Sequence, residues 1–292
     1  MTLSHSDALK KFITHLEDLG RSPSTVVAYK KDIEQLFEYF NNKINTVDEY
    51  ESKHLKNYVE LLVSEQRFTL KTISRKINSY KTLFKFLHKE NHVTQDAAQP
   101  ISHPKFTPKQ PRILSSLEYR ALRDTARSNT RLYAMIEILL QTGMRIGELS
   151  RLTLEDLQIE KTPYTVTIQE YASNPERVIE LNKDAVDAIQ GYLEKRPHPK
   201  KDAGLLFITK TGKQVLVRNI RTMINNAFKK SGISDVTVND IRNTFIVYQL
   251  EHGMPLERVA EIVGHQRLTS TEKYLNLLTN RKAAATTKIV SL

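Results

Sequence analysis

The chain has 292 residues, of which 39% are hydrophobic and 26% charged, enough to bury one large core or two ordinary ones, and this length favours two domains. It contains no cysteine, which excludes disulfides, thiolate catalysis and cysteine-based zinc sites. The formal net charge is +11, and residues 1–112 carry 18 Lys and Arg against 13 Asp and Glu, so both halves are basic. Such a charge distribution suits a protein that holds a long polyanion with two domains, or a lysine-rich surface that only faces water.

No apolar run approaches the length of a membrane span, and the N-terminal MTLSHSDALKKF lacks the apolar core of a signal peptide. We therefore expect a soluble protein of the cytoplasm. The nine histidines do not fall at ligand spacing, so the sequence predicts no metal site, and no cofactor is expected.

Residues 1–98 are expected to form a domain of short amphipathic helices. Ser22 is a natural N-cap before Pro23 in RSPSTVVAYKKDIEQLFEYF. In FTLKTISRKINSYKTLFKFLHKE, an apolar stripe at helical spacing leaves a second face that is polar and basic. That face either lies in a DNA groove or faces water, and it is formed by Lys71, Arg75, Asn78 and Thr82.

Residues 99–112 contain four prolines and no helical period, which is typical of an extended linker between two domains. Residues 113–292 then predict a mixed α+β domain in which helices dominate. Ser115 or Ser116 can begin one helix, and Gly143 ends the next. PYTVTIQE and ERVIELN are expected to be strands joined by the turn YASNP, and GLLFITKTGKQ is expected to supply a third short strand.

Polar side chains recur at the expected helix ends of this second domain. Arg145 directly follows a helix stop, and His265 follows Gly264, which suits a left-handed C-cap. Asn239 and Arg242 are three residues apart and therefore share a helical face.

Further along, Thr269 and Glu272 have the spacing of a capping box, which would start a helix carrying Tyr274. Singly, each feature has a structural explanation: an arginine or histidine that binds helix carbonyls, and a tyrosine packed in a core. Together, two arginines, a histidine and a tyrosine suit phosphoryl transfer. Guanidinium groups can clamp the charged oxygens of a phosphodiester, and neighbouring cations favour the phenolate of a nucleophilic tyrosine.

These motifs resemble those of the tyrosine recombinases of the phage-integrase and Xer type. TGMRIGELSRLTLEDL is similar to the family's T-G-[LM]-R-x-x-E-L-x-x-L, VTVNDIRNTF to H-x-L-R-H-T-F, and GHQRLTSTEKY to G-H-x(4)-T-x-x-x-Y. LEDLGRSPSTVVAYKKDIEQLFEYF resembles the family's helical domain that binds core DNA. The resemblance implies a helical DNA-binding domain and a catalytic domain that close as a C-shaped clamp around DNA.

Carried over by position, the resemblance implies that Tyr274 attacks the scissile phosphate, becomes linked to a 3′ phosphate and releases a 5′ hydroxyl. Arg145 and Arg242 would stabilise the charge on the phosphate, and His265 would hydrogen-bond a nonbridging oxygen and assist proton transfer. Asn239 stands where the family usually has a histidine. An amide can donate a hydrogen bond to phosphate but cannot act as an acid or base.

A second departure concerns the lysine that the family places in the turn between two strands, where it protonates the leaving 5′ oxygen. Alignment on ERVIEL puts Ala172 at that position. Lys161, Lys210 and Lys213 are the candidates to replace it.

The implied partner is a double-stranded DNA recombination site, bound in the cytoplasm at the nucleoid. Family members act as homotetramers on two DNA sites and exchange C-terminal segments. RKAAATTKIVSL, residues 281–292, is either such a segment or a disordered end. Accessory DNA-binding proteins are further candidate partners.

Several functions fit this resemblance. Integration or excision of a mobile element and resolution of cointegrates or dimers stay open, and the compact length leans towards Xer-like, resolution-type systems. A type IB topoisomerase uses the same chemistry, but the N-terminal domain fits a recombinase better. The alternative from another class is a catalytically impaired DNA-binding or architectural protein with the same fold, and the missing lysine supports it.

Overall fold

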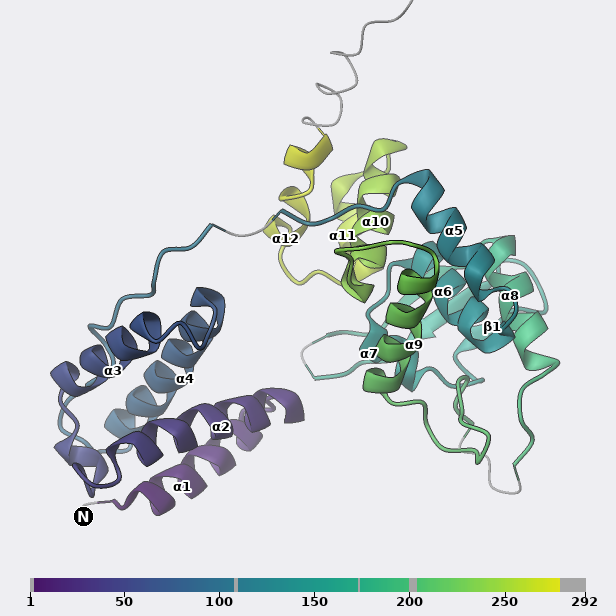
Figure 1. The fold of residues 1–292 in the computed structure, drawn as a ribbon. Coiled ribbons are helices and arrows are strands. Elements are labelled where there is room, and N and C mark those ends of the chain that lie inside the picture. Colours follow the sequence, from purple (N-terminus) through teal and green to yellow (C-terminus); the bar gives the residue numbers. More distant parts are fainter. Residues whose placement is uncertain (1–2, 108–109, 173, 200–203, 279–292) are drawn as a thin grey trace, which may run out of the picture. The chain divides into compact units, whose positions relative to one another are not determined.

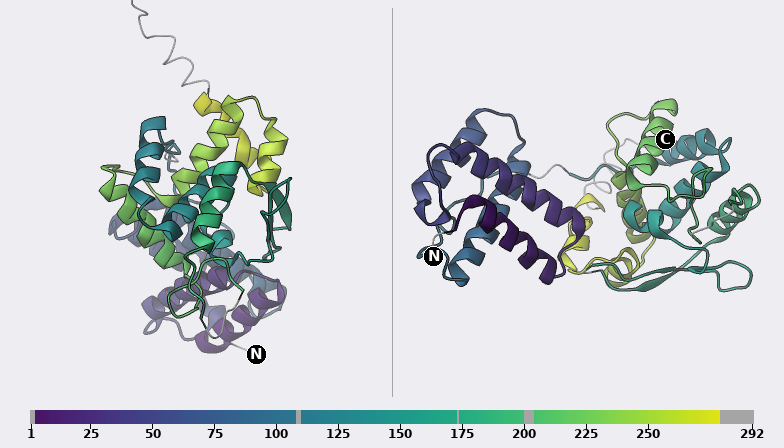
Figure 2. Two further views of the ribbon diagram at one scale, coloured as in Figure 1. Left: turned by 90° about the vertical axis from the view of Figure 1, so that its right-hand side faces the viewer. Right: turned by 90° about the horizontal axis from the view of Figure 1, so that it is seen from below.

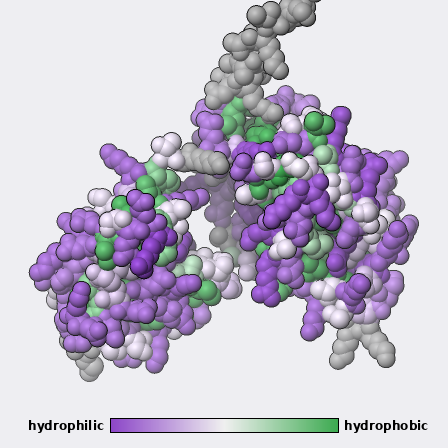
Figure 3. All heavy atoms as spheres, viewed as in Figure 1, coloured by the Kyte–Doolittle hydropathy of each residue, from purple (hydrophilic) through white to green (hydrophobic). Residues whose placement is uncertain are grey.

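The computed structural model describes residues 3–107, 110–172, 174–199 and 204–278. The chain divides into two compact units, Met1–Lys109 and Gln110–Leu292 (Figure 1). The described residues are mainly helical with one small sheet, which confirms the expected fold class. No described helix is both long and apolar enough to cross a membrane. Hydrophilic residues cover most of the visible surface of each unit (Figure 3).

The first unit is built from helices that begin where the sequence offers a capping side chain. Ser4, Ser22 and Thr69 each accept a hydrogen bond from a backbone N–H of the helix that follows. The longest helix packs against the other three, and its apolar stripe is buried as predicted. The elements are α1 (His5–Asp18), α2 (Pro23–Phe40), the 3-10 turn η1 (Val47–Glu49), α3 (Ser52–Ser64) and α4 (Leu70–Lys89).

A buried carboxylate ties α2 to α4. Asp32 is 1% exposed and accepts hydrogen bonds from Arg75, from Lys76 at 3.1 Å and from Ser79 at 2.7 Å. A buried carboxylate is costly unless it is paired, so these three donors help to fix how the helices pack. Arg75 is therefore held by its own unit, although its side chain stays 44% exposed.

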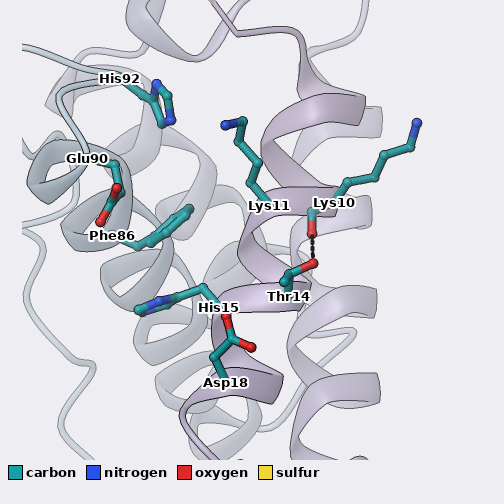
Figure 4. A pocket seen from close by; sticks show the side chains of 8 residues that line it. All are labelled: Lys10, Lys11, Thr14, His15, Asp18, Phe86, Glu90 and His92. Carbon is teal, nitrogen blue, oxygen red and sulfur yellow. Dashed lines mark hydrogen bonds between the residues drawn. The ribbon is translucent and has the colours of Figure 1, made fainter.

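A depression of about 430 Å³ lies between α1 and the end of α4 (Figure 4). On one wall, the ring of His15 stacks on Phe86 with the ring centroids 4.5 Å apart. The other lining residues include side chains of both charges and the hydroxyl of Thr14: Lys10, Lys11, Thr14, Asp18, Glu90 and His92.

The second unit is organised around α6, which packs against five other helices. Its sequence TRLYAMIEILLQT is hydrophobic on nearly every side, as expected of a helix at the centre of a core. Glu137 is the buried exception, and it is paired with Arg123 of α5. The helices are α5 (Ser116–Ala126), α6 (Thr130–Thr142), α7 (Ile146–Arg151), α8 (Lys183–Leu193), α9 (Val217–Lys230), α10 (Val238–Glu251), α11 (Leu256–Val263) and α12 (Thr269–Glu272).

The sheet has the strand order β1-β2-β3 and is antiparallel throughout. Val166 of β2 lies opposite Ile179 of β3, and both side chains are buried, in keeping with the alternating pattern of the sequence. β3 also packs against α11, which brings the sheet beside the C-terminal helices (Figure 2). The strands are β1 (Leu157–Gln158), β2 (Thr165–Ile168) and β3 (Arg177–Glu180).

The expected strand in GLLFITKTGKQ was wrong, because the third strand of the sheet is β1. Residues 204–214 instead contribute isolated bridges, from Leu205 to Thr153 and from Ile208 to Gln214. The backbone N–H of Thr209 donates to the carbonyl of Lys213 at 2.8 Å, so this segment folds back on itself in a turn. Its hydrogen-bonding groups are therefore used locally rather than along a sheet edge.

The helix start near residue 269 also differs from the expectation. Ser115 caps α5 as one of the two predicted residues, but the predicted capping box at Thr269 and Glu272 is absent. Leu268 occupies the N-cap position in a helical conformation, and its carbonyl accepts the hydrogen bond of Glu272 N–H. The chain thus enters α12 from a preceding turn, and Tyr274 lies just after this short helix instead of within it.

Candidate active site

Arg145 is placed by the sharp end of α6. Gly143 adopts a left-handed conformation with φ of 61° and ends the helix, and Arg145 then begins α7. A Cβ atom at residue 143 would lie 2.3 Å from the ring of Phe245 in α10. Glycine is therefore needed there both for its backbone conformation and for the close approach of the two helices.

Glu148 joins two arginines from distant parts of the sequence. Its Oε1 accepts hydrogen bonds from Arg145 Nη1 at 2.9 Å and Arg177 Nη1 at 3.2 Å. Its Oε2 accepts from the backbone N–H of Arg145 at 2.8 Å and from Arg177 Nη2 at 2.7 Å. Burial acts to raise the pKa of Glu148, but the hydrogen bonds and charges of the arginines outweigh it and leave that pKa below its ordinary value.

The same two arginines bind the C-terminal carbonyls of α11. Arg177 Nε donates to the carbonyl of Ile262 at 2.8 Å. Arg145 donates to the carbonyl of Val263 at 3.3 Å and to that of Gly264 at 2.7 Å. The turn that follows α11 is thereby attached to both α7 and β3.

Arg242 projects from α10 into the same region and is only 7% exposed. Its Nη1 donates to the carbonyl of Gly143 at 2.7 Å, so it also touches the turn before Arg145. Burial, followed by the charge of Arg145, lowers the pKa of Arg242 to about 9, and Glu148 acts in the opposite direction. The lowered pKa thus reflects burial first and then the neighbouring charge of Arg145, and a buried guanidinium beside a second one is a setting that favours an incoming anion.

His265 follows the left-handed Gly264 as predicted, and its Nδ1 lies 2.7 Å from the hydroxyl of Thr271. Burial and then the charges of Arg242 and Arg145 lower the pKa of His265 to about 4. The imidazole is therefore neutral near pH 7, with one ring nitrogen that can donate a hydrogen bond and one that can accept one.

Tyr274 is 3% exposed and packs in a small core with residues of α10 and α11. Its hydroxyl donates a 2.7 Å hydrogen bond to Oδ1 of Asn243. Burial raises the pKa of Tyr274, whereas the charge of Arg242 acts to lower it. The phenol thus lies beside the cationic cluster, held by an amide that cannot take its proton.

Asn239 lies at the edge of this group. It is exposed, and its Nδ2 donates to Oδ1 of Asn243 at 3.4 Å. Asn243 is fixed in turn by donating to Asp240 at 2.9 Å. Hydrogen bonds therefore connect Asn239 and Asp240 to Asn243, and Asn243 to the hydroxyl of Tyr274.

The three candidate lysines lie on exposed segments. Lys161 precedes β2, and Lys210 and Lys213 lie in the folded-back loop before α9. Within the described part of the chain, no hydrogen bond or ion pair joins them to Arg145, Arg242, His265 or Tyr274. Lys273 is the lysine whose charge contributes to the low pKa of His265, and its Nζ lies 5.0 Å from the ring centroid of Tyr274. Ala172, in the turn between β2 and β3, is exposed and has φ of 54°.

In the first unit, Lys71, Arg75 and Asn78 are all exposed on α4. They share one face, as the helical spacing predicted, and Arg75 is the one that also binds Asp32. This face belongs to the first unit, whereas the arginine cluster belongs to the second.

Sequence reasoning missed four residues of the cluster. Arg177 lies in the predicted strand ERVIELN and Glu148 in the motif TGMRIGEL, and neither was singled out for a role in the site. Asn243 and Thr271 were available signals, since Asn243 occupies the second histidine position of H-x-L-R-H-T-F and Thr271 lies between the two recognised residues His265 and Tyr274. Thr271 bonds to His265 six positions away, whereas Arg177 meets Glu148 across 29 positions and Asn243 meets Tyr274 across 31, distances that no local spacing indicates.

The arginines, a neutral imidazole and a tyrosine gathered in this unit are groups with which an enzyme could transfer phosphodiester bonds through its own nucleophile. The chain belongs to the phage integrase family and is a tyrosine-type site-specific recombinase. The phage integrase family matches residues 112–281, and the N-terminal SAM-like domain of phage integrases matches residues 9–91.

Curated relatives support this assignment along most of the chain. A tyrosine recombinase XerC of Leptospira interrogans is 30% identical over 282 residues, covering 94% of this chain and 90% of the relative. A tyrosine recombinase XerD of Rickettsia bellii is 26% identical over 281 residues, covering 91% and 92% of the two chains.

Solved structures share the fold. XerH recombinase bound to a palindromic difH substrate aligns with a TM-score of 0.76 at 19% identity, over 94% of this chain and 84% of that one. The integrase of transposon Tn1549 in complex with transposon right-end DNA aligns with a TM-score of 0.73 at 18% identity, over 96% and 100%. At these identities the likeness establishes the fold and not the details of the site.

Proposed function

We propose that this recombinase cuts DNA with Tyr274 and that Arg145, Arg242 and His265 hold the scissile phosphate. The observation that carries the proposal is the cluster of arginines around Glu148, because its unbalanced positive charge lies next to a buried phenol. A phosphate placed against Arg145 and Arg242 would supply the missing negative charge. Arginine stays protonated in this role and binds phosphate oxygens through paired donors.

The reaction then follows from the positions of these groups. The Tyr274 oxygen attacks phosphorus, the bond to the 5′ oxygen breaks with its electron pair, and that oxygen takes up a proton. A bound phosphate would offset the arginine charges that lower the pKa of His265, and the imidazole would then accept the phenol proton. Attack by a 5′ hydroxyl of a partner strand reverses the step, so the bond energy is conserved and ATP is not required.

The phenol must exchange partners before it can attack. In the described conformation its hydroxyl donates to Asn243 and is buried, so we propose that bound DNA draws it from the amide towards the phosphate. Asn239, at the outer edge of this line of side chains, would donate its amide hydrogen to a phosphate oxygen without taking part in proton transfer.

The experiment uses a DNA duplex nicked close to the cleavage point, which traps the covalent intermediate because the short fragment diffuses away. We expect a protein–DNA adduct through a 3′-phosphotyrosine, mapped to Tyr274 by mass spectrometry and absent from Tyr274→Phe. If the folded protein shifts the duplex in a gel but forms no covalent adduct, the catalytically impaired DNA-binding alternative is favoured instead.

The acid that protonates the 5′ oxygen can be identified with a substrate whose bridging 5′ oxygen is replaced by sulfur. A thiolate leaves without needing a proton, so the variant lacking the acid is slow on oxygen and normal on sulfur. We propose Lys161, Lys210 and Lys213 as candidates and add Lys273, whose charge reaches the site. If all four Lys→Ala variants cleave the oxygen substrate at the wild-type rate, none of them is the acid.

The wider assembly is also a proposal. We propose that the units with limits near 1–98 and 113–292, joined by 99–112, clamp duplex DNA, and that Lys71, Arg75 and Asn78 contact it. The proposal also includes a homotetramer on two DNA sites and accessory DNA-binding proteins. Neighbouring subunits would exchange C-terminal segments through residues 281–292, which lie outside the described residues. We place its action at the nucleoid in the cytoplasm.

Resolution is the biological role that we propose, since the XerC and XerD relatives match over about nine-tenths of their length. A plasmid with two directly repeated copies of the protein's site would test it. Loss of the intervening segment supports resolution, whereas joining of separate plasmids in preference to such loss supports integration of a mobile element.

A further inference from the structure

We propose that Arg177 of β3 is a positioning residue of the recombination reaction: it fixes the turn that carries His265 and prevents Glu148 from neutralising Arg145. The inference rests on the proposed function and assigns Arg177 no contact with DNA. Its side chain is 8% exposed, and its donors point to protein acceptors.

The first argument comes from the end of α11. The last carbonyls of a helix have no partner within the helix, and cations are favoured there by the helix dipole. Here Arg177 binds the carbonyl of Ile262, while Arg145 binds the next two carbonyls, those of Val263 and Gly264. Two arginines from separate elements therefore hold three consecutive residues, and His265 comes next.

Gly264 shows how closely Arg177 approaches this turn. A Cβ atom added at residue 264 would lie 2.9 Å from Cζ and Nη1 of Arg177, and the glycine has φ of 68°. The guanidinium of Arg177 thus occupies the space that any side chain at residue 264 would need. His265 is placed by this contact together with its own hydrogen bond to Thr271.

The second argument is a balance of charge. Glu148 has two guanidinium partners, of which Arg177 is buried and Arg145 is 35% exposed in its side chain. With Arg177 in place, the carboxylate is shared, and Arg145 keeps positive charge for an incoming phosphate. Without Arg177, Glu148 would pair with Arg145 alone and oppose the binding of the phosphate.

The inference also predicts an effect on His265, whose low pKa owes a contribution to the charge of Arg177. Removing this charge should let the pKa of His265 rise.

The test compares Arg177→Lys and Arg177→Met in the full chain. We expect Arg177→Met to slow covalent adduct formation on the nicked duplex roughly 10- to 100-fold, the usual effect of removing a partner that orients a reacting group. Affinity for the same duplex should change less than about threefold, because other phosphate contacts share it. Arg177→Lys keeps the charge but loses the forked geometry, so its rate should lie in between.

Arg123→Met is the matched control. Arg123 also pairs with a buried carboxylate, Glu137, but its other ion-pair partner is Asp184, and no hydrogen bond or ion pair among the described residues joins it to the cluster. We expect this variant to lose stability without slowing adduct formation at a temperature at which it is folded. The inference would be overturned if the loss of rate in Arg177→Met were no larger than its loss of folded protein accounts for. Arg123→Met calibrates that comparison, because it is expected to lose stability without losing rate.

A double variant separates charge from geometry. Glu148→Gln in the Arg177→Met background removes the carboxylate that would otherwise neutralise Arg145, so adduct formation should recover part of its rate, about tenfold or less. If Arg177→Met reacts at the wild-type rate, or loses DNA affinity in parallel with rate, the positioning role is wrong. Failure of the proposed function looks different, because the wild-type protein itself would then form no adduct.

Discussion

Arg145 and Arg242 differ in how much of their charge is already matched. Arg145 has Glu148 beside it, whereas Arg242 is buried and touches only the carbonyl of Gly143 among the described hydrogen bonds. Arg242 therefore depends on an incoming anion more than Arg145 does. Both guanidiniums lie close enough to each other for their charges to interact, as the lowered pKa of Arg242 shows.

Substitution of either arginine by alanine should strongly slow adduct formation and largely spare DNA binding. We expect Arg145→Ala and Arg242→Ala each to slow adduct formation by roughly 10²- to 10³-fold or more, as loss of a donor to a developing charge does. Affinity measured by gel shift should fall only modestly, because many other phosphate contacts remain. Parallel loss of binding and cleavage would show that the assigned roles are incorrect.

His265 gives a prediction about pH. Its pKa is lowered in the folded protein to about 4, from 6.5. As the pH falls from about 6.5 towards 4, His265 becomes protonated in the unfolded chain but stays neutral in the folded one, so the free energy of unfolding should decrease in this window. The contribution is fully present above pH 6.5 and lost below about 4.

Titration of the imidazole by NMR checks this directly. A phosphate next to the cluster would offset the positive charges of Arg242 and Arg145, so binding of uncleaved DNA by Tyr274→Phe should raise the pKa of His265. A free-protein pKa at or above the ordinary value would contradict the described burial.

Among the secondary-structure elements, the contact between the end of α6 and α10 carries the most constraint. Gly143 combines a left-handed backbone with a ring of Phe245 where a Cβ atom would be. This close approach also lets the carbonyl of Gly143 reach Arg242 at 2.7 Å. The turn therefore serves both the packing of the unit and the placement of two arginines.

Gly143→Ala should destabilise the protein more than a glycine substitution of similar backbone conformation elsewhere. Gly253→Ala is the control, because Gly253 has φ of 85° but open space around it. Backbone strain alone costs about 1–2 kcal/mol, and overpacking adds about 1–3 kcal/mol. Urea unfolding of the two variants should differ by that second amount, and equal losses would show that the Phe245 ring moves freely aside.

For the whole molecule, the basic character of both units is the property that governs binding to DNA. Lys71, exposed on α4, is a candidate phosphate contact, while Arg75 on the same face is partly committed to Asp32. A substitution at Arg75 would therefore disturb the first unit as well as its surface charge.

Lys71→Ala should weaken DNA binding about equally for all sequences and reduce the slope of log affinity against log salt by about 1. Lys30→Ala is the control, since Lys30 pairs with Glu34 on the surface of α2. An unchanged slope in Lys71→Ala would mean that this face of α4 points to water.

Local signals predicted much of the fold and part of the site. Ser22, Ser115 and the glycines at 143 and 264 cap helices where their neighbours in the sequence indicated, because capping depends on bonds within one turn. The same reasoning failed at Thr269, because the N–H of Glu272 is already bonded to the carbonyl of Leu268 in the turn before α12. It also failed for residues 204–214, where a turn used the groups that a strand would need.

The sequence by itself determined which chemical groups are present and in what order: two motif arginines, a histidine after a left-handed glycine and a tyrosine nine residues later. Only the tertiary structure decided their partners. Arg177 meets Glu148 across 29 positions and Ile262 across 85, and Asn243 meets Tyr274 across 31. Such pairings arise from the packing of whole helices and strands, whereas spacing along the chain encodes only bonds within a turn or a hairpin.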